Sequence, residues 1–317
     1  MIISASYKTD IPAFYGAWFL NRLRAEYCKM LNPYNRRAIR VSLSRTAVDG
    51  FVFWTKNLAP FLPALEEVRN RGYPFMVQYS INGYPRTLEF SVTDAGRSVN
   101  HMAWLRDNFG PMAGVWRYDP VIFTSVTDPE FHVRNFSRLA DKLFGLTNEV
   151  VVSFAQVYRK TERNMNWASK EFGFAWEDPK DEVKIQLARE FGAIANQHGM
   201  QLNMCSQPQF AVAGIGEAQC VSGARLSLLA GRQVKVSQKG NRPDCACSAS
   251  RDIGDYDTCP HGCVYCYAVQ NREVARQRYQ VHDPEGEYLF EPEPGSTEAQ
   301  NSGDPFQIAL FDDESTG

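Results

Sequence analysis

Three cysteines near the C-terminal end constrain this 317-residue chain more than any other feature. Cys259, Cys263 and Cys266 are spaced C-x3-C-x2-C, with Tyr265 directly before the last of them. A structural zinc site needs four ligands, so three thiolates on one short loop cannot complete it. Three thiolates can instead hold three irons of a [4Fe–4S] cluster, whose full protein ligation takes four. The spacing therefore predicts a cluster with one iron open to a small molecule, which is a catalytic arrangement. The alternative is a zinc knuckle or half of a zinc ribbon.

Ahead of this loop, the hydrophobic pattern alternates strands with helices. Amphipathic segments predict helices over 10–28, 60–71, 94–109, 128–144 and 181–198. Short apolar runs predict buried strands over 1–5, 50–54, 75–81, 113–118, 149–155 and 201–204, and residues 38–44 fit a further strand or an extended loop. Strands that alternate with helices pair in parallel, because each crossover returns the chain to the same end of the sheet. The expected fold class is α/β with six repeating units.

Polar residues follow each of the six predicted strands. In β/α barrels the chemistry collects at these C-terminal strand ends. One such cluster is usually a solvated turn, but six in phase predict a lined cavity. The clusters are Ser4, Ser6, Thr9 and Asp10, then Thr55, Lys56 and Asn57, then Gln78 and Ser80, then Arg117 and Asp119, then Ser153, Gln156 and Lys160, and finally Cys205.

A second set of cysteines precedes the C-terminal triplet. Cys205 ends the sixth predicted strand, Cys220 follows it, and Cys245 and Cys247 form a C-x-C pair. Four thiolates complete either an auxiliary [4Fe–4S] cluster or a tetrahedral zinc site. The alternative is four buried free thiols. A C-x-C pair in a loop rich in Gly, Pro and Asp is a poor core element, which favours a metal. Cys28 is expected to be a buried thiol at the end of its helix.

The sequence carries no export or membrane signal. Its first residues lack a basic region and a long apolar stretch, and no run approaches the ~18 apolar residues of a membrane span. We therefore expect a cytoplasmic protein without a membrane partner, whose cysteines bind metal rather than form disulfides. Ten acids and no bases fall in residues 283–317, which leaves 34 basic against 26 acidic residues in the rest of the chain. This surplus permits a polyanionic partner such as DNA.

The last part of the chain is typical of a disordered tail. From Asp283 the composition turns to Pro, Glu, Gly and Ser. Near the end, residues Gln307 to Phe311 (QIALF) resemble the QxxLF peptide with which bacterial repair and replication proteins dock on the DNA sliding clamp. An apolar anchor in a solvated tail has the form of a peptide ligand that lies in a groove. A chance occurrence of this short motif is the alternative.

Longer motifs resemble known families. The octapeptide from Cys259 to Cys266 resembles the cluster motif of the radical S-adenosylmethionine (SAM) superfamily, and its continuation CVYCY is similar to the spore photoproduct lyase and DNA repair photolyase branch. The segments SASYKTDIPAFY, FWTKN, WRYDP and CPHGCVYCYA together resemble an uncharacterised bacterial family, domain of unknown function 1848, over most of residues 1–280. In most radical SAM proteins the cysteine loop follows the first strand, whereas here it follows every predicted strand.

The resemblance implies a particular architecture and cofactors. The fold would be a partial (β/α)6 TIM-type barrel over 1–205. A permuted, cysteine-rich segment over 206–282 would carry the cluster loop to the barrel mouth, and 283–317 would be the acidic tail. The cofactors would be a [4Fe–4S] cluster and SAM, which together yield a 5′-deoxyadenosyl radical. An electron donor such as flavodoxin or ferredoxin is implied as a partner.

The resemblance also implies roles for strand-end residues and a class of substrate. Asp10, Lys56, Arg117 and Asp119 are expected to contact SAM, with Asp10 on the methionyl amine. The substrate would be damaged DNA or a nucleobase, and a base in a duplex would have to leave the stack to reach a buried site. Two alternatives stay open: radical SAM modification of RNA, a peptide or a small molecule, and a non-catalytic, metal-stabilised nucleic-acid-binding module.

Overall fold

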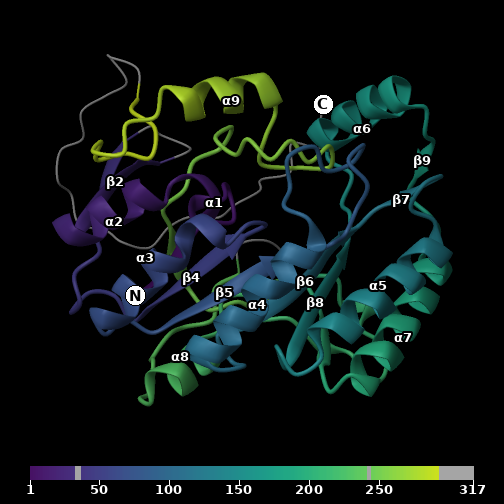
Figure 1. Ribbon diagram of the computed structural model, residues 1–317, viewed down its shortest axis with the longest axis horizontal. Coiled ribbons are helices and arrows are strands. Elements are labelled where there is room, and N and C mark those ends of the chain that lie inside the picture. Colours follow the sequence, from purple (N-terminus) through teal and green to yellow (C-terminus); the bar gives the residue numbers. More distant parts are fainter. Residues whose placement is uncertain (33–36, 241–243, 293–317) are drawn as a thin grey trace.

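The computed structural model of the chain describes residues 1–32, 37–240 and 244–292, and a parallel sheet forms its centre (Figure 1). Eight strands pair in the order β11-β10-β8-β6-β5-β4-β1-β12, and each neighbouring pair is parallel. The fold class is therefore α/β, as predicted. The strands are β1 (Ile2–Ala5), β4 (Gly50–Thr55), β5 (Phe75–Ser80), β6 (Gly114–Val121), β8 (Glu149–Phe154), β10 (Gln201–Met204), β11 (Gly216–Glu217) and β12 (Ser250–Asp252).

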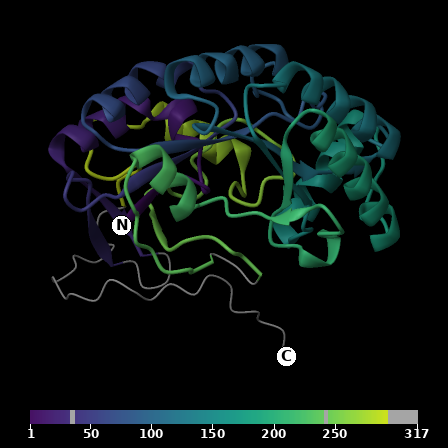
Figure 2. The same ribbon diagram turned by 90° about the horizontal axis from the view of Figure 1, so that it is seen from below.

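Helices join successive strands, and most of them lie on one face of the sheet. Figure 2 shows the helices coloured purple to teal as an arc over that face. Aromatic rings fill the space beneath them: Phe136 of α5 stacks between Trp116 at 4.7 Å and Phe191 of α7 at 4.3 Å. The helices are α1 (Ile11–Phe14), α2 (Gly16–Ala25), α3 (Leu62–Asn70), α4 (Ala95–Phe109), α5 (Pro129–Leu143), α6 (Arg159–Phe172), α7 (Asp181–Gln197), α8 (Gly223–Ala230) and α9 (Arg272–Gln280).

On the opposite face of the sheet the side chains form two layers. Alternate residues of a strand point to the same face, so each strand contributes one side chain to each layer. The lower layer is apolar, and Leu226 of α8 closes it from this side (green in Figure 2). Its strand residues are Ile2, Val52, Met76, Val115 and Val151. The next layer, toward the carboxyl ends of the strands, is polar and contains Ser4, Trp54, Gln78, Arg117 and Ser153. The sheet thus has an apolar floor beneath a polar chamber.

The six predicted strands are confirmed, but the two edge strands and two of the helices, α6 and α8, were not predicted. The β12 strand reads Ser250-Arg251-Asp252 and has no apolar run, because it forms the edge of the sheet beside β1. Its anchor is Asp252, whose carboxylate accepts hydrogen bonds from the hydroxyls of Ser4 and Ser6, each at 2.7 Å. Polar pairing of this kind leaves no periodic hydrophobic signal in the sequence.

The predicted helix over 10–28 is wrong in its second half. It breaks at Tyr15 and ends at Ala25, and Glu26 adopts the left-handed conformation with φ of 61°. The chain then forms β2 (Tyr27–Leu31), which pairs antiparallel with β3 (Ala38–Ser42). Cys28 is therefore a buried thiol, as expected, but it lies in a strand. A second small ladder joins β7 (Phe123–Thr124) to β9 (Trp176–Glu177), and two short 3₁₀ turns span Ala59–Phe61 and Pro208–Phe210.

The segment 206–282 is part of the same sheet, since it supplies β11 and β12. Residues 283–292, which were expected to belong to the disordered tail, are instead held against α2 and β2. Trp18 Nε1 donates to the carbonyl of Gly286 at 3.0 Å, and the Lys29 N–H donates to that of Glu287 at 2.8 Å. The clamp-like peptide Gln307–Phe311 lies outside the described residues. In the part of the chain that is described, no helix combines the length and the apolar character needed to cross a membrane.

Candidate functional site

One cavity of about 300 Å³ lies at the carboxyl ends of the strands. The structure brings all eleven residues that the sequence singled out for cofactor or metal binding to its wall. Every strand of the sheet sends the residues at or after its C-terminal end to this wall. The predicted residues there are Asp10, Lys56, Arg117, Asp119, Cys205, Cys220, Cys245, Cys247, Cys259, Cys263 and Cys266.

The cluster loop, residues 259–266, is fixed to the sheet by main-chain hydrogen bonds. The N–H of Val264 donates to the carbonyl of Leu88 at 3.1 Å, and the N–H of Ser91 donates to that of His261 at 2.9 Å. At the N-terminal side of the loop, the hydroxyl of Tyr15 donates to the carbonyl of Thr258 at 2.5 Å. The loop is therefore held between the segment after β5 and the segment after β1.

The three loop thiols are desolvated and face several backbone donors. Burial raises the pKa of Cys259 well above its usual value, and Asp10 and the other two thiols add to this effect. Burial also raises the pKa of Cys263 and of Cys266. Against this, the backbone N–H of His261 acts to lower the pKa of Cys259, and those of Ala268 and Val269 act to lower that of Cys266. Backbone donors on sulfur are what a thiolate-bound cluster uses to set its potential.

A buried cation lies beside the loop. The Lys56 ammonium is 2.9 Å from Oε1 of Glu89, which also accepts from the hydroxyl of Tyr265. Burial acts to lower the pKa of Lys56, but Glu89 and, less strongly, Cys263 outweigh it and raise that pKa. In turn, Lys56 acts to lower the pKa of Cys263 and Cys266. The cation therefore favours the thiolate forms that iron would need.

Asp10 connects α1, the segment after β4 and the cluster loop through hydrogen bonds. Its Oδ1 caps α1 by accepting the N–H of Ala13 at 2.9 Å, and its Oδ2 accepts from the N–H of Lys56 and from Nε2 of His261, both at 2.7 Å. A carboxylate offers about four lone-pair sites, so three are already in use. The expected contact of Asp10 with a methionyl amine would take the last one.

Arg117, which is buried, and Asp119, which is half-buried, form a second ion pair in the cavity. Nε of Arg117 donates to Oδ2 of Asp119 at 3.0 Å, and Oδ1 of Asp119 accepts from the hydroxyl of Ser153. The guanidinium also donates to the sulfur of Cys220 at 2.8 Å and lies 5.1 Å from the ring centre of Trp54. Burial alone would lower the pKa of Arg117, but Asp119 and the thiols raise it.

The second set of thiols lies beside Arg117. The sulfur of Cys205 is 3.6 Å from that of Cys220. Cys247 acts on the pKa of Cys220, Cys245 acts on that of Cys247, and the N–H of Val221 donates to the sulfur of Cys247 at 3.3 Å. The bond with Cys205 acts to lower the pKa of Cys220, but the bond with Cys247 and burial raise it to about 12. These residues come from three separate segments, and only the tertiary structure assembles them.

The cavity also contains Thr9, which the sequence placed at the end of the first strand, and aromatic residues that the sequence did not single out. The hydroxyl of Thr9 is buried and has no hydrogen-bond partner among the described residues, so it is available to a polar ligand group. Tyr7, Trp54 and Tyr256 supply aromatic surface. His261 was expected to shape the cluster loop from its position inside the motif, but its bond to Asp10 and the role of Glu89 were not predicted.

The described residues contain no group of three or more His, Cys, Asp or Glu side chains arranged to hold a single metal ion. This finding counts against a single zinc ion more than against a cubane cluster. Each thiolate of a [4Fe–4S] cluster binds a different iron, so the sulfurs do not converge on one point. The cysteine loop, the N–H groups on its sulfurs and the nearby cation fit a cluster. The unpaired hydroxyl of Thr9 fits a polar ligand beside it.

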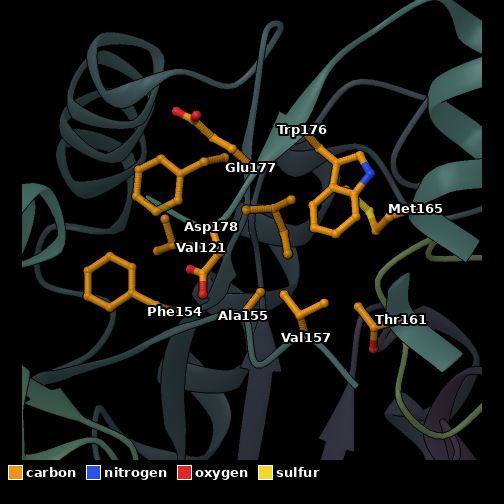
Figure 3. Close-up of a pocket in the computed structure, with 11 residues that line it drawn as sticks. Val121, Phe154, Ala155, Val157, Thr161, Met165, Trp176, Glu177 and Asp178 are labelled. Atoms are coloured by element: carbon orange, nitrogen blue, oxygen red, sulfur yellow. The ribbon is translucent and has the colours of Figure 1, made fainter. Parts of the chain in front are cut away.

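A second pocket lies between the end of β8, α6 and β9 and is unrelated to this chemistry. Figure 3 shows its wall, in which Phe154, Val157, Met165 and Trp176 predominate. Its volume is about 20 Å³. That is space for about one water molecule, so the pocket is too small for a substrate.

Comparison with known protein families identifies the family of this chain. A family described as a domain of unknown function, DUF1848, matches residues 2–268. The matched region begins in β1 and ends just after the cluster loop, so it includes every residue assigned above to the cavity wall. No curated protein matches the chain.

Proposed function

Since the chain belongs to the DUF1848 family, whose function is unknown, we propose from the site itself that it is a radical SAM-type iron–sulfur enzyme. Cys259, Cys263 and Cys266 would hold the cluster. When bound, the cluster and SAM supply a 5′-deoxyadenosyl radical that abstracts hydrogen from a substrate. The observation that carries the proposal is that these three thiols line the same cavity as the carboxyl ends of the strands.

The sheet topology supports this proposal. β12 is an edge strand beside β1, and the chain runs from it through the cluster loop into α9. A strand, a cysteine loop and a helix at the edge of a parallel sheet are how the resembled superfamily begins. We therefore interpret the sheet as a partial β/α barrel in which β12, added to the six predicted strands, opens the first unit, and this unit has moved to the C-terminal end of the chain. The permutation changes the order of the units along the chain but keeps their order in the sheet.

The proposed roles of the surrounding residues follow from their contacts. Lys56 would neutralise thiolate charge at Cys263 and Cys266, and Asp10 would hold the loop through His261. The hydroxyl of Thr9 would bond a polar group of SAM. Arg117 and Asp119, in the same cavity, would position SAM or the substrate.

We propose damaged DNA or a nucleobase as the substrate. Tyr7, Trp54 and Tyr256 provide the aromatic surface on which an extruded base could stack. Lys8 lies over Tyr7 and Tyr256, at 5.8 and 5.4 Å from the ring centres, and would attract a phosphate. RNA, a peptide or a small molecule is the alternative substrate, and a metal-stabilised nucleic-acid-binding module is the alternative function.

The second thiol group extends the proposal. Cys205, Cys220, Cys245 and Cys247 would hold an auxiliary [4Fe–4S] cluster or a zinc ion, with the guanidinium of Arg117 bonded to one sulfur. Iron, sulfide and zinc counts on Cys205→Ala and Cys220→Ala variants distinguish these. Loss of four irons per chain indicates a cluster, and loss of one zinc indicates an ion.

Anaerobic reconstitution tests the main proposal. Protein supplied with iron and sulfide and then reduced with dithionite should show a cluster by electron paramagnetic resonance, and on addition of SAM it should release 5′-deoxyadenosine. Cys263→Ala should abolish the release, whereas Cys28→Ala, which alters a buried thiol away from the cavity, should not. A protein that takes up zinc alone and yields no 5′-deoxyadenosine would favour the binding module.

A further inference from the structure

An exposed aromatic and basic surface covers the outer side of the cluster loop. We call it the α6–α9 patch and define it by Phe90, Arg163, Trp167, Phe172 and Arg272. Trp167 and Phe172 belong to α6 and are 50% and 39% exposed, which is unusual for side chains so large. In Figure 1, α6 and α9 lie along the same edge of the molecule.

The patch touches the cluster loop directly. Gly262 lies between Cys259 and Cys263, and a Cβ there would meet Arg272 Cδ at 2.8 Å and Phe90 Cδ2 at 3.2 Å. Because Gly262 has no side chain, the two patch residues rest on the loop backbone. The N-terminal half of α6 is fixed to the end of the same loop region, since Arg163 donates to the carbonyl of Gln270 and Asn164 Nδ2 donates to that of Val269 at 3.4 Å.

The patch is positively charged. The α6 helix carries four basic residues against two acidic ones, Glu162 and Glu171, and α9 carries three against Glu273. Arg276 is paired with Glu273 only at 3.9 Å, and both side chains are more than half exposed, so the pair neutralises little. A negatively charged protein surface would be attracted to this side of the molecule.

We propose that the α6–α9 patch docks a small, acidic, one-electron carrier protein that reduces the cluster. The inference rests on the proposed function, because only a cluster enzyme needs such a donor. Electron transfer weakens steeply with distance, so a donor must bind close to the cysteine loop, and this patch lies on it. Exposed aromatic residues and arginine are also the residue types that interfaces favour, and redox complexes need only small ones.

A protein partner fits the ring geometry better than a nucleic acid does. Bases stack on open ring faces. Here Arg272 lies over the Phe90 ring at 4.2 Å, and Trp167 meets Phe172 edge-on at 87° with ring centres 6.0 Å apart. The rings pack against one another and present an uneven apolar surface with a basic rim.

The test measures binding and turnover separately on the full-length chain. Binding of a bacterial flavodoxin is titrated at low salt against the unaltered protein, Trp167→Ala, Arg272→Glu and the control Arg134→Glu, an exposed arginine of α5. We expect at least tenfold weaker binding for the two patch variants, no change for the control, and a loss of affinity with added salt. With dithionite in place of flavodoxin, the unaltered protein and the Trp167→Ala variant should release 5′-deoxyadenosine at equal rates.

The outcomes separate the two proposals. Equal flavodoxin binding by all four proteins overturns the docking site while leaving the proposed function intact. Failure of the unaltered protein to release 5′-deoxyadenosine with dithionite overturns the proposed function instead. If the patch variants lose affinity for a short DNA duplex but keep it for flavodoxin, the patch is a nucleic-acid surface and the inference is wrong. Arg272 rests on the cluster loop, so Arg272→Glu can lose binding through a folding defect. Trp167→Ala is the second patch variant, which tests the docking site independently of that defect.

Discussion

Nε2 of His261 lies 2.7 Å from Oδ2 of Asp10, and this contact joins residues 251 positions apart. It fastens the cluster loop to the first helix of the chain, where Oδ1 of the same carboxylate caps α1. The two ends of the chain thus build one wall of the cavity.

Replacing Asp10 by Asn tests the contribution of the Asp10–His261 contact to stability. The amide keeps one acceptor oxygen but turns an NH₂ group toward donors, so we expect a loss of about 1–3 kcal/mol in the free energy of unfolding. Chemical denaturation measures the loss, and iron uptake should fall with it. Asp128→Asn at the exposed start of α5 is the matched control, since that carboxylate bonds only a helix N–H in the described residues. A larger loss in the free energy of unfolding for Asp128→Asn than for Asp10→Asn would contradict the proposed role of the Asp10–His261 contact.

Removing Lys56 should be more damaging than removing its whole ion pair. Lys56→Met leaves Glu89, which is 4% exposed, without its cation, and an uncompensated buried charge costs about 3–5 kcal/mol. The double variant Lys56→Met with Glu89→Gln removes both charges and should recover part of that loss. A double-mutant cycle from denaturation curves measures the coupling between the two residues. Strict additivity would show that the pair is not coupled.

Gly262→Ala should impair the cluster loop. Its φ is +72°, which disfavours any other residue, and the added Cβ would also clash with Arg272 and Phe90. Gly173→Ala separates these two effects, because Gly173 has a φ of +70° with no atom within 4 Å of its Cβ position. We expect about 1–2 kcal/mol of strain in both variants and a further loss only at Gly262. The midpoint of thermal unfolding and the iron content after reconstitution measure the difference.

His132 should make the fold sensitive to acid. Burial lowers its pKa to about 4, while Nε2 bonds the carbonyl of Ile122 at 2.9 Å and Nδ1 bonds the hydroxyl of Tyr118 at the same distance. The unfolded chain binds a proton near pH 6.5, so it holds more protons than the folded chain between pH 6.5 and about 4. Stability is therefore complete above that range and falls as the pH drops through it, by about 3 kcal/mol in all.

The comparison that isolates this effect is His132→Asn. Urea unfolding at pH 5.0 and at pH 7.5 should show a smaller pH difference for the variant than for the unaltered protein, although the variant is less stable at both values. An unchanged difference between the two pH values would assign the acid sensitivity to other groups.

The sequence alone determined the α/β class and all six central strands, because buried parallel strands leave apolar runs that stand out against amphipathic helices. It also singled out eleven residues that the structure places around one cavity, since the ends of parallel strands meet at the same edge of a sheet. Only the tertiary structure decided that β12 lies beside β1 and that His261 bonds Asp10. Those contacts are polar, short and distant in sequence, so no local periodicity records them, and they form only once the sheet has brought the segments together.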